Sequence, residues 1–448
     1  MLKSIFPIVL CLCVCFTACK DTTNENTTNE NSGTDTKHVT IQKNDSGLTQ
    51  FYIDGEPFVL KGVGFESDQY AALKTAGGNA IRTWRTTDPV GVLDSAAKYG
   101  FMVAMGLDIN KELHHFDYND EAAVAKQFEG IKKQVLQYKD HPNLLCWVAG
   151  NELNLLFNED GSLKLVNPKT YIALNDIVQY IKEVDPNHPV TTTFAGGDKS
   201  QVELCLEHCP NLNFLSFQIY GGLDAVHKMA KNAAPTMPYV VTEFGPKGHW
   251  EVPVTEWGRE IEEPSSVKAK GYAQRMATAF GTNPNGLCLG GFAFLWGQKQ
   301  ERTPTWYGVL GKNGEPTETV DELTKIWTGS YPTNRAPQVQ QISIDGKIPT
   351  DNLYVKPGSQ HKASVKFLDP ENDPLKVKYT IMNEVKERSQ GGAFEKEPEE
   401  LAFKHSISSS NKELVFTAPT EEGDYRLFVY VYDDQGKLGY SNMPFYVK

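Results

Sequence analysis

Residues 144–152 read Leu-Leu-Cys-Trp-Val-Ala-Gly-Asn-Glu, an apolar run that ends abruptly in a Gly-Asn-Glu triplet. A continuous apolar run of this length is typical of a strand buried on both faces of a parallel sheet. Residues 238–243 repeat the design, because Glu243 follows the run Pro-Tyr-Val-Val-Thr. Parallel barrels carry functional side chains at the carboxyl ends of their strands. Glu152 and Glu243 are therefore predicted to lie at the same end of one sheet.

Strand-like and helix-like patterns alternate on both sides of these two runs, which predicts a parallel sheet covered by helices. The predicted strands are 61–66, 79–84, 101–107, 144–149, 190–194, 213–220, 238–242 and 290–296. The predicted helices are 71–76, 90–99, 121–138, 171–184 and 265–280. Eight strands within 38–328 predict an α/β (β/α)8 TIM barrel, in which Glu152 ends the fourth strand and Glu243 the seventh. Residues 51–60 precede the barrel and are predicted to form a hairpin with Asp-Gly at its tip.

The character of the chain changes after this barrel. Residues 328–337 are rich in turn-forming residues and are predicted to be a linker. Residues 338–448 show short alternating strands at 363–367, 376–381, 413–417 and 425–432, without helical periodicity. This pattern predicts a small all-β sandwich of immunoglobulin or fibronectin type.

The N-terminus has the pattern of a targeting segment. Residues 1–19 combine Lys3 with an apolar stretch too short to span a bilayer, and they end Phe-Thr-Ala-Cys. Small residues before Cys19 resemble a bacterial lipobox, which implies lipidation of Cys19 and an anchor in the cell envelope. Lys20-Asp21 directly after the cysteine resembles the surface-export signals of Bacteroidetes lipoproteins. The alternative is an ordinary cleaved signal peptide. Residues 20–37 are polar and partly repeated, which predicts a disordered tether.

Composition and charge limit the partners. The 448 residues carry 44 Lys+Arg against 56 Asp+Glu, a net charge of −12 without a basic cluster, so nucleic acid is an unexpected partner. We expect a monomer that meets a membrane only through its lipid anchor. Cys146 and Cys288 lie in apolar runs and are predicted to be buried, whereas the Cys205-x3-Cys209 pair is predicted to be structural, with a disulfide as one option. The histidines show no ligand spacing, so no metal or other cofactor is expected.

Several strand-end residues together resemble the retaining glycoside hydrolases of clan A, whose acid/base and nucleophile glutamates end barrel strands four and seven. The resemblance rests on Gly150-Asn151-Glu152, Arg82, Tyr220 and Thr242-Glu243-Phe244-Gly245. The resemblance covers the barrel, about residues 50–300. The segment Ile53 to Pro246 is most similar to barrels acting on β-1,3-glucan, including the fungal glucanosyltransferases, and also resembles family two barrels. The resemblance implies a β-glucan substrate.

The chemistry of a retaining glycosidase assigns roles to these residues. Glu152 is expected to protonate the leaving oxygen and then to activate water, and Glu243 is expected to attack the anomeric carbon. Arg82 is expected to hold Glu243 by a charge-assisted hydrogen bond, with Arg85 as the alternative arginine. Tyr220 is expected to donate its hydroxyl to the same carboxylate.

Further strand-end side chains are candidates for binding sugar. Asn151 is expected to bind the sugar 2-hydroxyl and Trp296 to support a sugar ring, unless Trp296 is core at the barrel top. Glu66 and Asp108 are expected to bind hydroxyl groups. Three tryptophans on later loops were predicted to be either cleft walls or loop anchors: Trp250, Trp257 and Trp306.

The expected function is therefore that of a retaining glycoside hydrolase that cuts β-glucan, with β-1,3 linkages favoured and cleavage within the chain. One alternative is a β-glucan transglycosylase that uses the same pair of glutamates. The other is a non-catalytic glycan-binding lipoprotein, against which the presence of both glutamates argues.

Overall fold

The computed structural model describes residues 36–85, 88–389 and 392–448. Residues 1–35 lie outside the described part of the chain. They include the expected signal peptide, the expected lipidation site Cys19 and nearly all of the expected tether. Within them, no helix is both long enough and apolar enough to cross a membrane.

One parallel sheet forms the barrel, and its strand order is β8-β7-β6-β5-β4-β12-β11-β10-β9. Its strands are β4 (Gly62–Glu66), β5 (Ala80–Arg82), β6 (Met102–Leu107), β7 (Leu144–Ala149), β8 (Val190–Thr191), β9 (Thr193–Ala195), β10 (Leu215–Gln218), β11 (Tyr239–Phe244) and β12 (Cys288–Gly297). Thr192 alone separates β8, which pairs with β7, from β9, which pairs with β10. These two pieces together are the fifth strand, and the predicted eight-stranded barrel is confirmed.

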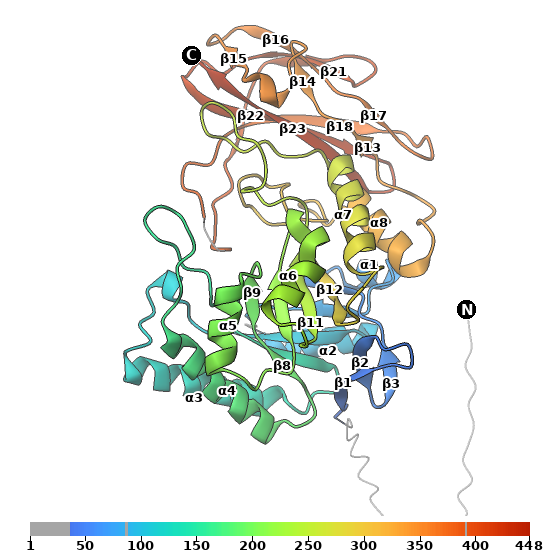
Figure 1. The fold of residues 1–448 in the computed structure, drawn as a ribbon. Helices are drawn as coiled ribbons and strands as arrows, with labels where there is room; N and C mark the ends of the chain where they lie inside the picture. The colour runs from blue at the N-terminus through green and yellow to red at the C-terminus, as the bar shows by residue number, and fades with distance from the viewer. Residues whose placement is uncertain (1–35, 86–87, 390–391) are drawn as a thin grey trace, which may run out of the picture. The chain divides into compact units, whose positions relative to one another are not determined.

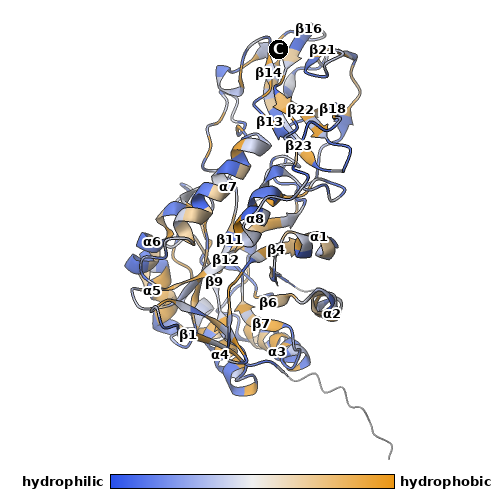
Figure 2. Cartoon of the chain, turned by 90° about the vertical axis from the view of Figure 1, so that its right-hand side faces the viewer, coloured by the Kyte–Doolittle hydropathy of each residue, from blue (hydrophilic) through white to orange (hydrophobic). Residues whose placement is uncertain are grey.

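Helices cover the outside of the barrel (Figure 1). They are α1 (Tyr70–Thr75), α2 (Pro89–Tyr99), α3 (Glu121–Tyr138), α4 (Pro168–Val184), α5 (Lys199–His208), α6 (Val226–Ala233), α7 (Ser265–Ala279) and α8 (Glu318–Thr328), with short 3-10 turns at Glu112–His114, Gly221–Ala225 and Pro349–Asp351. Hydrophilic and hydrophobic residues mix along these helices in Figure 2, as expected where one face packs on the sheet. The strands β6, β7 and β11 are buried at every position, which explains the unbroken apolar sequence of β6 and β7 and the apolar start of β11 before Thr242 and Glu243.

Local sequence explains where several elements begin and turn. The Asp120 side chain accepts hydrogen bonds from the N–H groups of Ala122 and Ala123 and so caps α3. The hairpin before the barrel consists of β2 (Thr49–Ile53) and β3 (Glu56–Phe58), and β1 (Val39–Lys43) pairs with β2. Its turn residues Asp54 and Gly55 have φ of 53° and 85°, which suits an Asp-Gly turn of the kind predicted.

Sheets that are antiparallel except for the parallel pair β15–β23 form the C-terminal part, and the predicted all-β fold is confirmed. One sheet has the order β14-β16-β21-β20, another has the order β15-β23-β22-β18-β19, and β13 pairs with β17. The strands are β13 (Gln338–Val339), β14 (Ser343–Ile344), β15 (Tyr354–Val355), β16 (Gln360–Ser364), β17 (Phe367–Leu368), β18 (Lys376–Asn383), β19 (Glu400–Leu401), β20 (His405–Ile407), β21 (Glu413–Thr417), β22 (Gly423–Tyr432) and β23 (Leu438–Val447). A hydrophobic core of their own, which includes Ile381, Leu427 and Phe445, joins the two larger sheets.

A buried ion pair marks the contact between the barrel and the C-terminal sheets. Nζ of Lys268 on α7 lies 2.5 Å from Oε1 of Glu262, and the two side chains are 4% and 0% exposed. From β23, Nδ2 of Asn442 donates to Glu262 at 2.6 Å and the Tyr440 hydroxyl donates to the Thr305 carbonyl at 2.9 Å. Although burial opposes it, the Lys268 ammonium holds the pKa of Glu262 below its usual range. Two domains that share such a network are expected to unfold together.

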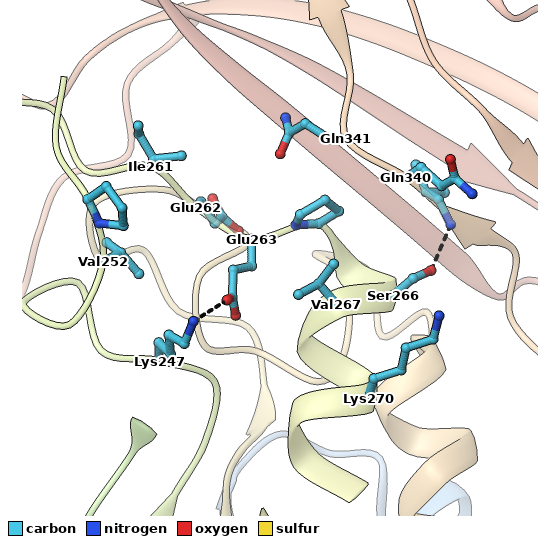
Figure 3. A pocket seen from close by; sticks show the side chains of 13 residues that line it. Lys247, Val252, Ile261, Glu262, Glu263, Ser266, Val267, Lys270, Gln340 and Gln341 are labelled. Carbon is cyan, nitrogen blue, oxygen red and sulfur yellow. Dashed lines mark hydrogen bonds and ion pairs between the residues drawn. The ribbon is translucent and has the colours of Figure 1, made fainter. Parts of the chain in front are cut away.

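A hollow of about 350 Å³ lies beside this network and is lined from both sides of the contact (Figure 3). Lys247 and Glu263 form an ion pair of 2.8 Å on its barrel side. The N–H of Val339 in β13 donates to Oγ of Ser266 on α7 at 2.9 Å. Neither Glu152 nor Glu243 lines it.

The predictions for the four cysteines of the barrel have different outcomes. Cys146 and Cys288 are buried, as predicted. Cys205 and Cys209 are both buried thiols, so the disulfide considered for them is wrong. Cys205 lies in α5 and its carbonyl accepts the N–H of Cys209 at the helix end, so each thiol packs separately into the core.

Candidate active site

Three donors surround the carboxylate of Glu243, which lies within β11 and is 6% exposed. Nη1 of Arg82 lies 2.6 Å from Oε1, and Nε1 of Trp84 lies 2.5 Å from the same oxygen. The Tyr220 hydroxyl donates to Oε2 at 2.8 Å. Arg82 ends β5, Trp84 follows it, and Tyr220 follows β10, so the closure of the barrel brings the three donors together. Charge-assisted hydrogen bonds of this kind fix a carboxylate in one orientation.

Arg82 also connects Glu243 to the end of the fourth barrel strand. Its second terminal nitrogen, Nη2, donates to Oδ1 of Asn151 at 2.6 Å, and this oxygen also accepts Nε2 of Gln218 at 2.5 Å. The Asn151 oxygen is therefore occupied, and its Nδ2 has no hydrogen-bond partner within residues 36–85, 88–389 and 392–448. An amide donor held in this way can serve a sugar hydroxyl, which agrees with the role expected for Asn151.

A left-handed turn places Glu152 directly after this asparagine. Gly150 and Glu152 have φ of 81° and 52°, and the N–H of Glu152 donates to Oγ1 of Thr193 at 2.8 Å. A non-glycine residue with positive φ costs about 1–2 kcal/mol and is held by the structure around it. The turn ends the strand abruptly and leaves the Glu152 side chain 15% exposed.

The carboxyl of Glu152 is protonated more readily than an ordinary glutamate. Burial, opposed by Lys111 and assisted by the negative charge of Glu243, raises its pKa to about 7. Nζ of Lys111 lies 3.7 Å from Oε2 of Glu152. The site thus pairs one carboxyl that keeps its proton near neutral pH with one carboxylate surrounded by donors.

The acids at the ends of the first and third barrel strands differ in their relation to this pair. Glu66 has an exposed side chain, but protein atoms around its carboxyl partly exclude water and raise its pKa. Lys299 opposes this rise and the negative charge of Glu243 assists it, so Glu66 lies within electrostatic reach of Glu243. Asp108 is also exposed, and its charge acts on His114. The structure therefore brings Glu66 toward the pair and leaves Asp108 without a described contact to it.

Trp296 does not support the role expected for it. Its side chain has no exposed surface, it packs in the barrel core, and its indole N–H donates to the Gln69 carbonyl at 3.2 Å. The expectation of a sugar platform is therefore wrong, because the indole is enclosed in the barrel core and has no face open to a ligand. Trp84 at the end of β5 is the tryptophan that contacts a catalytic candidate. The sequence signal that could have found it is its position two residues after Arg82.

The loop tryptophans separate into one exposed, one half-buried and one buried residue. Trp306 is 1% exposed and donates to the Lys247 carbonyl at 3.0 Å, and Trp257 packs on Tyr354 of the C-terminal sheets, so both are anchors. Trp250 is 61% exposed, and its ring centroid lies 5.5 Å from that of Tyr220. Trp250 is thus the exposed aromatic beside the Glu243 donors.

A further acid, Glu301, lies within electrostatic reach of Tyr220. Glu301 is buried, and Nζ of Lys299 lies 2.8 Å from it, while Nε2 of His249 lies 3.5 Å away. Burial raises the pKa of Glu301, but His249 and Lys299 outweigh it and lower this pKa to about 2. Glu301 therefore stays negative and contributes to the raised pKa of Glu152.

Arg82 rather than Arg85 contacts Glu243, as predicted. No cluster of three or more metal-ligating side chains occurs in the part of the chain that the structure describes. The arrangement can supply a proton from Glu152, a fixed nucleophile at Glu243 and a hydroxyl-binding amide at Asn151.

Comparison with known proteins places this site in a family context. Residues 66–249 match the family model for glycosyl hydrolases family 2, TIM barrel domain. A stretch of 118 residues is 29% identical to an Aspergillus terreus protein named "Probable mannan endo-1,4-beta-mannosidase C", which covers 24% of this chain and 28% of that protein.

Among solved structures, the fold is similar to three bacterial β-glucuronidases. Bacteroides uniformis β-glucuronidase 2 matches 92% of this chain and 48% of its own, with a TM-score of 0.51 and 16% identity. The Ruminococcus gnavus enzyme matches 66% and 53%, with a TM-score of 0.51 and 15% identity. The Bifidobacterium dentium enzyme matches 66% and 50%, with a TM-score of 0.51 and 17% identity. The chain thus spans about half the length of these structures and less than a third of the mannosidase.

Proposed function

We propose that this chain, which contains a glycoside hydrolase barrel of the family 2 type, is a retaining β-glycosidase that works by double displacement. The observation that carries the proposal is the contrast between the two strand-end acids. Glu243 receives hydrogen bonds from Arg82, Trp84 and Tyr220, whereas the pKa of Glu152 is raised to about 7. A nucleophile must be ionised and a general acid must hold a proton, and these two environments meet those needs.

In the first step, Glu243 attacks the anomeric carbon while Glu152 donates its proton to the leaving oxygen. The carbon–oxygen bond to the leaving group breaks and a glycosyl ester of Glu243 forms. In the second step, Glu152 takes a proton from water, the water oxygen bonds to the anomeric carbon, and Glu243 departs as a carboxylate. Asn151 Nδ2 is the donor suited to the sugar 2-hydroxyl in both steps.

For the substrate we propose a neutral β-glucan, with β-1,3 linkages favoured and cleavage within the chain. This rests on the resemblance of the strand-end motifs, on the net charge of −12 and on Trp250, whose exposed ring adjoins Tyr220. A β-mannan is the second candidate, favoured by the mannosidase relative. Transfer to a sugar acceptor instead of water would use the same residues.

The location we propose is the cell envelope, with the chain anchored by lipid on Cys19. Labelling of cells with a radioactive or clickable palmitate tests this. Label in the wild type and none in a Cys19→Ala variant is the expected result, and equal label would contradict it.

The experiment that tests the function is a product analysis on β-1,3-, β-1,4-, mixed-linkage and β-1,6-glucans, β-mannan, β-galactan and an aryl β-glucuronide. Shorter oligosaccharides from β-1,3-glucan are expected, and products longer than the starting chain would indicate transfer. Cleavage of β-mannan or of the glucuronide alone would overturn the β-glucan proposal and leave the retaining mechanism. If the wild type releases no more product than the Glu243→Gln variant from every substrate, the enzymatic proposal is overturned.

A further inference from the structure

The connection between β18 and β19 contacts the barrel segment that follows β12, through hydrogen bonds from Arg302 to Ser389 and Glu395. Its anchor is Glu395, which is 4% exposed although it lies in a loop. One oxygen of Glu395 accepts the N–H of Arg302 at 2.6 Å and Nε2 of Gln300 at 3.0 Å, and the other accepts Nη1 of Arg302 at 2.9 Å and the N–H of Ser389 at 2.9 Å. Burial opposes it, but these donors hold the pKa of Glu395 below its usual range. Three of these hydrogen bonds come from Gln300 and Arg302 of the barrel, so the buried carboxylate fixes the loop to the barrel.

The barrel residues that Glu395 holds belong to the segment that follows β12. The same segment carries Lys299 and Glu301, which form an ion pair of 2.8 Å. Lys299 acts on the pKa of Glu66, and Glu301 acts on the pKa of Glu152. A Cβ atom added to Gly392 would lie 3.7 Å from Nζ of Lys299. The connection therefore lies against the catalytic end of the barrel.

Phe394 lies between these two contact points, Gly392 and Glu395, and its side chain is 90% exposed. No other large hydrophobic side chain in the described residues is as exposed, and the next is Val59 at 66%. An exposed aromatic ring without a covering neighbour is the kind of surface on which the apolar face of a sugar ring packs. Trp250, 61% exposed beside Tyr220, is a second such ring, supplied by the barrel.

We propose that the C-terminal domain supplies part of the substrate cleft, with Phe394 as an aromatic subsite for a sugar unit distant from the cleaved bond. This rests on the proposed glycosidase function and deepens it. It assigns the enzyme to chains several sugars long, because a ring held by another domain is useful only to a substrate that extends beyond the catalytic pair. Glu395 is the positioning residue of this subsite.

The test compares Phe394→Ala with the wild type on a ladder of oligosaccharides and on a one-sugar aryl β-glycoside. Loss of one stacking contact is expected to lower kcat/KM for the longer oligosaccharides about five- to tenfold, and to leave the aryl glycoside unchanged. Leu368→Ala is the matched control, because Leu368 is a 54% exposed apolar residue in β17 of the same domain. An equal loss on short and long substrates, or no loss beyond that of Leu368→Ala, would overturn the proposal.

A readout without catalysis separates this inference from the proposed function. Affinity electrophoresis in gels that contain the polymer compares Glu243→Gln with Glu243→Gln/Phe394→Ala. The double variant is expected to migrate faster, and equal migration would overturn the subsite. A wild type that binds and cleaves nothing on the panel would overturn the enzymatic proposal instead.

Discussion

Nη1 of Arg82 lies 2.6 Å from Oε1 of Glu243, and the two side chains are 0% and 8% exposed. A buried ion pair is favourable only where further hydrogen bonds satisfy both partners. Here Trp84 and Tyr220 complete the carboxylate and Asn151 accepts Nη2 of Arg82, whose buried Nε has no hydrogen-bond partner among the described residues. Arg82 thereby fixes the nucleophile of the seventh strand relative to the end of the fourth.

The two glutamates should fail in different ways when they are replaced. Glu243→Gln is expected to lower kcat by at least about 10⁴-fold, because no covalent intermediate can form. Glu152→Ala is expected to lose about 10²–10⁴-fold on an unactivated substrate and much less on an aryl glycoside whose leaving group needs no proton.

Azide provides the decisive comparison between these two variants. Azide should restore turnover of Glu152→Ala and give a β-glycosyl azide, because it attacks the glycosyl enzyme without needing a base. Rescue of the Glu243 variant with a β product would reverse the assignment of the two roles.

Trp84→Phe tests the indole hydrogen bond to the nucleophile. A hydrogen bond to a charged group contributes about 1.5–3 kcal/mol, so kcat/KM is expected to fall about 10- to 150-fold with little loss of stability. Trp296→Phe is the control, since its N–H serves the Gln69 carbonyl in the core. Steady-state kinetics and thermal denaturation of both variants suffice, and equal activity losses would contradict the role of Trp84.

The pH profile should report the proton of Glu152. Its pKa of about 7 predicts that kcat/KM falls as pH rises through about 7, because the general acid is then deprotonated. The same carboxyl affects stability, since its pKa is raised by folding. Its favourable contribution to the free energy of unfolding is fully present below about pH 4.5, the ordinary pKa of glutamate, and is lost as pH rises through about 7. Glu152→Gln should therefore be more stable than the wild type at pH 8 and nearly equal at pH 5, and a difference of the opposite sign would contradict the assignment.

Lys111→Met should shift the pH profile of kcat/KM to higher pH. The Lys111 ammonium lowers the pKa of Glu152 from 3.7 Å away, so its loss should shift the alkaline limb to higher pH. Lys132→Met on α3 is the control, because Lys132 pairs with Glu129 on the surface. An unchanged limb in Lys111→Met would mean that another group is the acid.

The sequence was sufficient for the barrel because the buried parallel strands contain unbroken apolar runs, such as residues 144–149 and 239–241. It was sufficient for the catalytic pair because both glutamates end such runs. It could not place Trp296, whose side chain direction depends on the pleat of β12, nor Lys111 and Glu301, which lie on loops. Helices α5, α6 and α8 were not predicted, and each is 11 residues or fewer.

Lys268→Met tests the junction between barrel and C-terminal sheets. The change leaves the Glu262 carboxylate buried without its cation, which is expected to cost about 3–5 kcal/mol of folding stability. Lys270→Met, on an exposed position of the same helix, should cost much less. Denaturant unfolding followed by both tryptophan fluorescence and far-UV circular dichroism should show one transition for both domains. Two separate transitions would contradict the shared network.

The most direct test of the central claim is the stereochemistry of the first product. Proton NMR of a digest, recorded before mutarotation on the polymer that the panel identifies, resolves the anomeric signal of the newly formed reducing end. Attack by Glu243 followed by water predicts that the β anomer appears first and that the α anomer grows later. An α anomer that appears first would mean a single displacement, and Glu243 could not be the nucleophile.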